Sequence, residues 1–165
     1  MVSRLTGHGI LLIFLCAALL SGCCPGGVAV LESLTLPVEE QNDCSLVPAS
    51  QVTGGPAAGA STNPLATSNS ETVAAIAPAI TGSATERVKS AYAAVYECEP
   101  GGPQVRVYAI VFYEPTDSVR AAMLEANMDG VMFKGQLAGV VLADEDACES
   151  CYDAVRVRAE RVLGK

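Results

Sequence analysis

Residues 104–113 would carry apolar side chains on both faces of an extended chain. They are the clearest strand in the sequence. One face carries Val105, Val107, Ala109, Val111 and Tyr113, and the other carries Tyr108, Ile110 and Phe112. Residues 91–98 are ambiguous, because their apolar residues recur at both helical and strand spacing. A strand is favoured there, since an isolated strand needs a partner. The Glu-Pro-Gly-Gly-Pro run at 99–103 supplies the turn between the two strands.

The chain after this hairpin predicts a helix, a second hairpin and a last helix. Pro115 and Thr116 open the first helix, in which apolar residues recur at i, i+3, i+4 and i+7 up to about residue 126. Residues 131–133 and 137–143 form the second hairpin around a Lys-Gly turn. The last helix begins at Asp146, with Glu149 three residues on, and stops at Gly164.

The N-terminal half carries weaker signals. Residues 28–47 are predicted to form an arm with one or two short strands. Residues 48–70 contain no charge and few sizeable apolar residues, so they cannot bury enough surface to offset their ordering entropy. They are predicted to be a flexible linker. Capping boxes at 68–71 and 83–86 mark two helix starts, and Pro78 stops the first of these helices.

These elements predict an α+β domain at residues 71–165. Hairpins imply antiparallel pairing, and helices need a sheet face to cover. We expect an antiparallel sheet of four or five strands with helices packed on one face. The flexible linker at 48–70 would precede it, after a tether and arm at 23–47.

The first 22 residues read as an export signal. Arg4 is the only formal charge before Glu32, and residues 10–20 are uninterruptedly apolar. This run is too short for a spanning helix, which needs about 20 apolar residues. A plain secretory signal that is cut nearby and a short membrane helix are the alternatives to the lipoprotein signal described next.

Leu20-Ser21-Gly22-Cys23 closes the apolar run and resembles the lipobox of bacterial lipoproteins. The resemblance covers residues 1–23 only. It implies that the Cys23 sulfur receives diacylglycerol, that a peptidase cuts before Cys23, and that the protein is held on the extracytoplasmic side of a membrane. In a two-membrane envelope the outer membrane is expected, because Cys24 stands where an inner-membrane retention signal usually has Asp. Two acyl chains already give stable anchoring, at about 0.8 kcal/mol per buried methylene.

Composition narrows the chemistry of the exported part. Removal of residues 1–22 leaves 143 of the 165 residues and takes the formal charge from −8 to −9, because Arg4 is lost. This acidity argues against nucleic acid as a partner. His8, the only histidine, also leaves with the signal, which excludes histidine-based catalytic dyads and ligands. We expect no enzymatic activity, no cofactor and no metal.

Four cysteines are the disulfide candidates of the exported domain: Cys44, Cys98, Cys148 and Cys151. An oxidising compartment favours bridges, and Cys24 is the natural unpaired residue beside the anchor. Cys148 and Cys151 fall on the apolar face of the last helix. At least one of them is therefore predicted to be bridged to Cys44 or Cys98.

Other sites are weighed against these bridges. Cys148-Glu149-Ser150-Cys151 also matches a redox Cys-x-x-Cys motif, but neighbouring carboxylates disfavour the thiolate. The four cysteines have the ligand count of a zinc site. Five acidic residues suggest calcium, although first-turn acids that complement a helix dipole are the plainer interpretation: Asp144, Glu145, Asp146, Glu149 and Asp153. Four tyrosines suggest a ligand groove, although cross-strand packing is the commoner role: Tyr92, Tyr96, Tyr108 and Tyr113.

The sequence thus indicates a membrane-anchored extracytoplasmic lipoprotein with a small acidic domain that binds an envelope protein or is structural. The alternative is an extracytoplasmic thiol–disulfide protein that uses Cys148 and Cys151.

Changing Cys23 to Ser is expected to abolish fatty-acid incorporation and leave the chain uncleaved at this site, because serine offers no thiol to diacylglycerol. Metabolic labelling with a fatty acid measures this. Equal label in the wild type and in Cys23→Ser would refute the lipobox interpretation.

Overall fold

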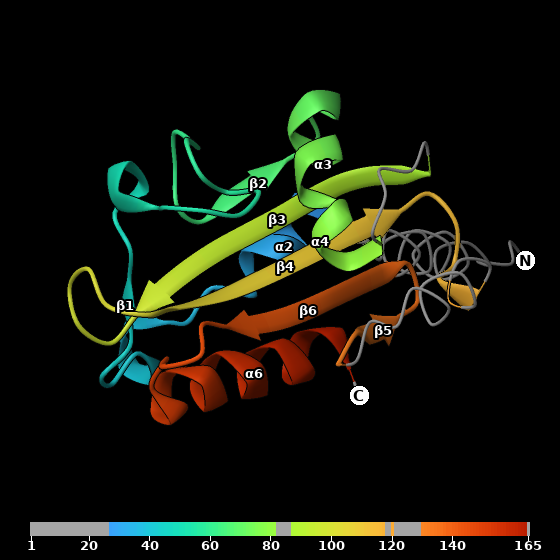
Figure 1. The fold of residues 1–165 in the computed structure, drawn as a ribbon. Helices are drawn as coiled ribbons and strands as arrows, with labels where there is room; N and C mark the ends of the chain where they lie inside the picture. The colour runs from blue at the N-terminus through green and yellow to red at the C-terminus, as the bar shows by residue number, and fades with distance from the viewer. Residues whose placement is uncertain (1–26, 82–86, 118–119, 121–129, 165) are drawn as a thin grey trace, which may run out of the picture.

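The computed structural model describes residues 27–81, 87–117, 120 and 130–164, and the strands in this part form one six-stranded antiparallel sheet (Figure 1). The strand order is β1-β3-β4-β6-β5, and β2 pairs with β3 on the same side as β1. The strands are β1 (Ser45–Leu46), β2 (Leu65–Thr67), β3 (Val88–Glu97), β4 (Gln104–Phe112), β5 (Met132–Lys134) and β6 (Leu137–Ala143). The predicted α+β class with an antiparallel sheet is confirmed, although the sheet has six strands where four or five were expected, because the short strands β1 and β2 also pair with β3.

Six helical segments have both of their bounds within the described residues. They are α2 (Gly27–Glu32), η1 (Val38–Glu40), η2 (Ala49–Gln51), α3 (Ser70–Ile76), α4 (Pro78–Thr81) and α6 (Glu149–Leu163). Within the described ranges no helix is long and apolar enough to cross a bilayer. The predicted signal peptide, Cys23 and Cys24 lie outside these ranges, as do the capping box at 83–86 and most of the predicted helix after Pro115.

Helices cover both faces of the sheet, which corrects the expected one-sided arrangement. Helices α3 and α4 pack against one face, whereas α2 and α6 pack against the other (Figure 1). The reason lies in β3 and β4, because residues on both of their faces are buried. A strand that is apolar on both faces needs cover on both sides.

Residues 48–70 are not a flexible linker in the structure. Val52 and Ala57 are buried in the core on the α3 side, and β2 pairs with β3 from Leu65 to Thr67. The side chain of Asn63 donates to the carbonyl oxygens of Val47, at 2.7 Å, and of Val95, at 2.8 Å, and accepts from the Val95 N–H at 3.1 Å. Specific hydrogen bonds and a short strand therefore order this segment, although it contains few large apolar side chains.

The N-terminal arm also belongs to this folded unit. Residues 27–32 are helical, whereas the arm was predicted to contain one or two short strands and no helix was expected there. Leu31, Leu34 and Leu36 are buried against the α6 side of the sheet. The arm binds β3 through two tyrosine hydroxyls. Tyr92 Oη lies 2.9 Å from Thr35 Oγ1, and Tyr96 Oη accepts from the Leu36 N–H at 2.9 Å.

Two helix starts differ by a residue or more from their predicted positions. Asn69 caps α3, because its Oδ1 accepts from the N–H groups of Glu71 and Thr72 at 3.0 and 3.1 Å. Pro78 ends one helix and opens the next, since a proline at the first helical position gives up no hydrogen bond. The last helix begins at Glu149 with Cys148 as its N-cap, rather than at Asp146.

Asn63→Ala is expected to lower the free energy of unfolding by about 1–3 kcal/mol, because it removes the Asn63 partner of the Val47 carbonyl oxygen and of the Val95 N–H. Chemical denaturation measures the loss. Gln51→Ala, at an exposed position in the same segment, is the matched control and should change stability little. Equal stability of the Asn63 variant and the control would contradict the integration of residues 48–70.

Candidate functional site

Four cysteines from four distant segments meet where helix α6 begins. Cys44 lies in the arm just before β1, and Cys98 follows β3 at the tip of the first hairpin. Cys148 is the N-cap of α6, and Cys151 lies in its first turn. Two disulfides join these segments, Cys44–Cys151 and Cys98–Cys148. The prediction of disulfides is confirmed, and both Cys148 and Cys151 are bridged to a distant partner.

The two bridges have ordinary backbone spacing. The Cα atoms are 4.9 Å apart in Cys44–Cys151 and 6.4 Å apart in Cys98–Cys148, both within the range that disulfides span. The sequence separations are 107 and 50 residues. Both bridges therefore close long loops and pin α6, one to the arm and the other to the hairpin.

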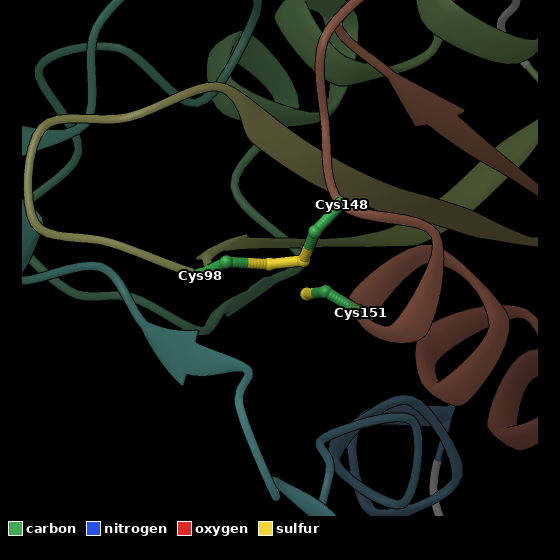
Figure 2. A group of neighbouring side chains, drawn as sticks. All are labelled: Cys98, Cys148 and Cys151. Carbon is green, nitrogen blue, oxygen red and sulfur yellow. A yellow bond between two sulfur atoms is a disulfide. The ribbon is translucent and has the colours of Figure 1, made fainter.

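The bridges differ in burial but lie side by side. Cys44 and Cys151 are 1 % and 0 % exposed, whereas Cys98 and Cys148 are only partly buried. Figure 2 shows the Cys151 sulfur beside the Cys98–Cys148 bridge, and the sulfurs of Cys98, Cys148 and Cys151 all lie within 4.8 Å of one another. An accessible disulfide thus covers a buried one.

Local hydrogen bonds position the start of α6. The Ala147 N–H donates to the Asp144 carbonyl at 3.0 Å, and the Tyr152 N–H donates to the Cys148 carbonyl at 3.1 Å. The Asp144 carboxylate accepts from the Gln104 N–H at 2.9 Å and pairs with Arg106 at 2.5 Å. These contacts hold the pKa of Asp144 below its usual range, with the Arg106 hydrogen bond as the main cause.

The zinc site and the calcium site considered from the sequence are each disfavoured by a different feature of the structure. The cysteine cluster has the residue types of a zinc site, but each of the four sulfurs is held in a disulfide and none is a thiolate ligand. Of the acidic residues, Asp144 is paired with Arg106, and Asp153 is paired with Arg156 at 3.2 Å. These two carboxylates neutralise cations of the chain itself.

The four tyrosines do not converge on a groove. Tyr92 and Tyr96 are buried on the α6 side of the sheet, Tyr108 is buried on the α3 side, and Tyr113 is exposed. Burial raises the pKa of Tyr92, Tyr96 and Tyr108, so these phenols stay neutral in the fold. Opposite Tyr92 on β4 stands Ala109, and opposite Tyr108 on β3 stands Ala93, so large residues face small ones across the strands.

Sequence reasoning missed the polar contacts that hold the arm against α6. Arg158 Nε donates to the Ser33 carbonyl at 2.7 Å, and Arg161 pairs with Glu40 at 2.8 Å. These two arginines lie in the second half of α6, where cations also suit the helix dipole. Their spacing along one helix was the available signal, but the partners in the arm could not be read from it.

A shallow surface hollow of about 440 Å³ runs along this contact between the arm and α6. Its lining residues are Glu39, Glu40, Asn42, Ser150, Asp153, Ala154, Val157 and Arg161. Glu40 and Asp153 already hold arginines of this chain. Two of the three carboxylates that line the hollow are thus already paired with arginines of this chain.

No protein-family model, curated protein or solved structure matches this chain.

Replacing both cysteines of either bridge by alanine is expected to lower the free energy of unfolding by about 2–4 kcal/mol. The loss should be larger for Cys44 and Cys151, which close the longer loop and are buried. Denaturation with and without reductant measures this, and the difference from the wild type should shrink to a repacking effect in reductant. A variant as stable as the oxidised wild type would contradict a structural role for that bridge.

Proposed function

We propose that this protein is an extracytoplasmic lipoprotein, anchored by diacylglycerol on Cys23, whose disulfide-bonded acidic domain binds an envelope partner or is structural. The observation that carries the proposal is the pair of long-range disulfides in the folded domain. Such bridges persist in oxidising compartments and are rare in reducing ones. They agree with the export signal predicted to end at Leu20-Ser21-Gly22-Cys23.

The chain between the proposed anchor at Cys23 and the folded domain is short. Only residues 24–26 separate Cys23 from the first residue of α2. The four residue steps from Cys23 to Gly27 span at most about 14 Å when fully extended. A lipid on Cys23 would therefore hold the folded domain close to the membrane surface rather than at the end of a long tether.

A non-enzymatic role is the simpler assignment for this domain. Cleavage before Cys23 would remove the only histidine, His8. The cysteines of the domain are paired, and the carboxylates of Asp144 and Asp153 bind arginines. These groups are committed to holding the fold, and a binding or structural role needs no further catalytic group.

A thiol–disulfide activity is the second candidate, and the closeness of the sulfurs favours it. The Cys98–Cys148 bridge is partly exposed at the N-terminus of a 15-residue helix, where a thiolate is stabilised. Against it, Cys148 and Cys151 belong to different bridges rather than to one local redox pair.

The compartment is tested by trapping thiols in living cells. The full-length chain is compared with a control that lacks residues 2–22 and so cannot be exported. After acid quenching and alkylation, peptide mapping should find both bridges in the full-length chain and free thiols in the control. The N-terminal peptide of the full-length chain should begin at Cys23 and carry the mass of the lipid, and Cys24→Ser should keep that lipid.

Free domain thiols in the exported chain, or a mature N-terminus without lipid at Cys23, would overturn the proposal. An assay of protein-disulfide reduction separates the two candidates. Repeated turnover of a disulfide substrate with a dithiol, lost in Cys148→Ser, would establish the thiol–disulfide activity instead.

A further inference from the structure

We infer that the two disulfides form an internal relay, in which reduction of the accessible Cys98–Cys148 bridge transfers bonding to Cys148–Cys151 and releases Cys44 from helix α6. The inference concerns the folded domain alone and does not depend on the lipid anchor. Its site is the sulfur cluster at the start of α6 (Figure 2). Its co-reactant is a dithiol reductant.

Accessibility decides where a reductant enters. Cys44 and Cys151 are almost fully buried, so an external thiolate reaches the partly exposed Cys98–Cys148 bridge first. It attacks the Cys98 sulfur, a mixed disulfide forms on Cys98, and Cys148 leaves as a thiolate. Cys148 is the better leaving group, because it is the N-cap of α6 and the N-terminus of a helix stabilises a thiolate.

Two contacts moderate the charge around the Cys148 thiolate. The Ser150 hydroxyl lies 3.7 Å from the Cys148 sulfur and can donate to it. The nearest preceding acidic cluster begins with Asp144, whose charge is compensated by Arg106. One of the carboxylates that were expected from the sequence to disfavour a Cys148 thiolate is therefore neutralised by an ion pair in the fold.

Proximity decides what the Cys148 thiolate does next. The Cys151 sulfur lies within 4.8 Å of it, three residues along the same helical turn. The thiolate attacks Cys151, a Cys148–Cys151 bond forms, and the Cys44–Cys151 bond breaks. Cys44 leaves as a thiolate and takes a proton from solvent, and its thiol can then donate to the Cys151 carbonyl oxygen, which lies 4.0 Å from the Cys44 sulfur.

The second thiol of the reductant resolves the mixed disulfide on Cys98. Overall the dithiol is oxidised by two electrons, and the protein gains two thiols, on Cys44 and Cys98, while one disulfide remains. The consequence is mechanical. The arm loses its covalent link to α6 and is held there by contacts such as Arg158 with Ser33 and Arg161 with Glu40.

Partial reduction of the full-length protein in detergent tests the relay. The oxidised protein is treated with limiting dithiothreitol, quenched in acid, alkylated and mapped by peptide mass, with Cys24 scored separately. In the form with two new thiols, Cys44 and Cys98 should carry the label and Cys148–Cys151 should be the remaining bridge. A two-thiol form labelled on Cys98 and Cys148, with Cys44–Cys151 intact, would overturn the inference.

Two single variants test the same step without reductant. Cys98→Ser frees Cys148 from the start, so Cys44 should lose its bridge and become labelled. Cys148→Ser is the matched control, because it removes the attacking sulfur, and Cys44 should stay bonded to Cys151. Retention of Cys44–Cys151 in Cys98→Ser, or equal labelling of Cys44 in both variants, would refute Cys148 as the attacking group.

Discussion

The Cys44–Cys151 bridge and the strand pair β3–β4 together constrain the rest of the structure. Both strands are buried on both faces, so the chain has to supply cover on each side. On one side the cover comes from α3, α4 and the segment before them, and on the other it comes from the arm and α6. The bridge joins the arm to α6 across a separation of 107 residues, so the two pieces of that second layer cannot part while it is intact.

Polar contacts fix the position of the arm in this layer, which apolar packing alone would not define. The hydroxyls of Tyr92 and Tyr96 fix the path of the arm over β3, and Arg158 fixes it against α6. Burial keeps both phenols neutral by raising their pKa values, so they remain hydrogen-bonding groups throughout the neutral range. A small domain gains definition from such contacts and from disulfides, because its core is limited in size.

The sequence predicted the elements with strong periodicity and failed where order comes from specific partners. The strand at 104–113 had apolar residues on both faces, and that pattern already implied two covered faces, although we inferred one. Residues 48–70 lack bulky side chains, so composition indicated a linker. The hydrogen bonds of Asn63 that order this segment join groups far apart in sequence and leave no local pattern. The four cysteines were the right candidates, but their pairing required the fold that brings them together.

The account depends most directly on how the four cysteines are paired in the oxidised protein. Peptide mapping of the full-length chain under non-reducing conditions, after thiols are blocked at acid pH, measures this. The structure predicts two cross-linked peptides, one joining Cys44 to Cys151 and the other joining Cys98 to Cys148. A Cys148–Cys151 pair in the untreated protein, or free thiols at Cys44 and Cys98, would contradict it.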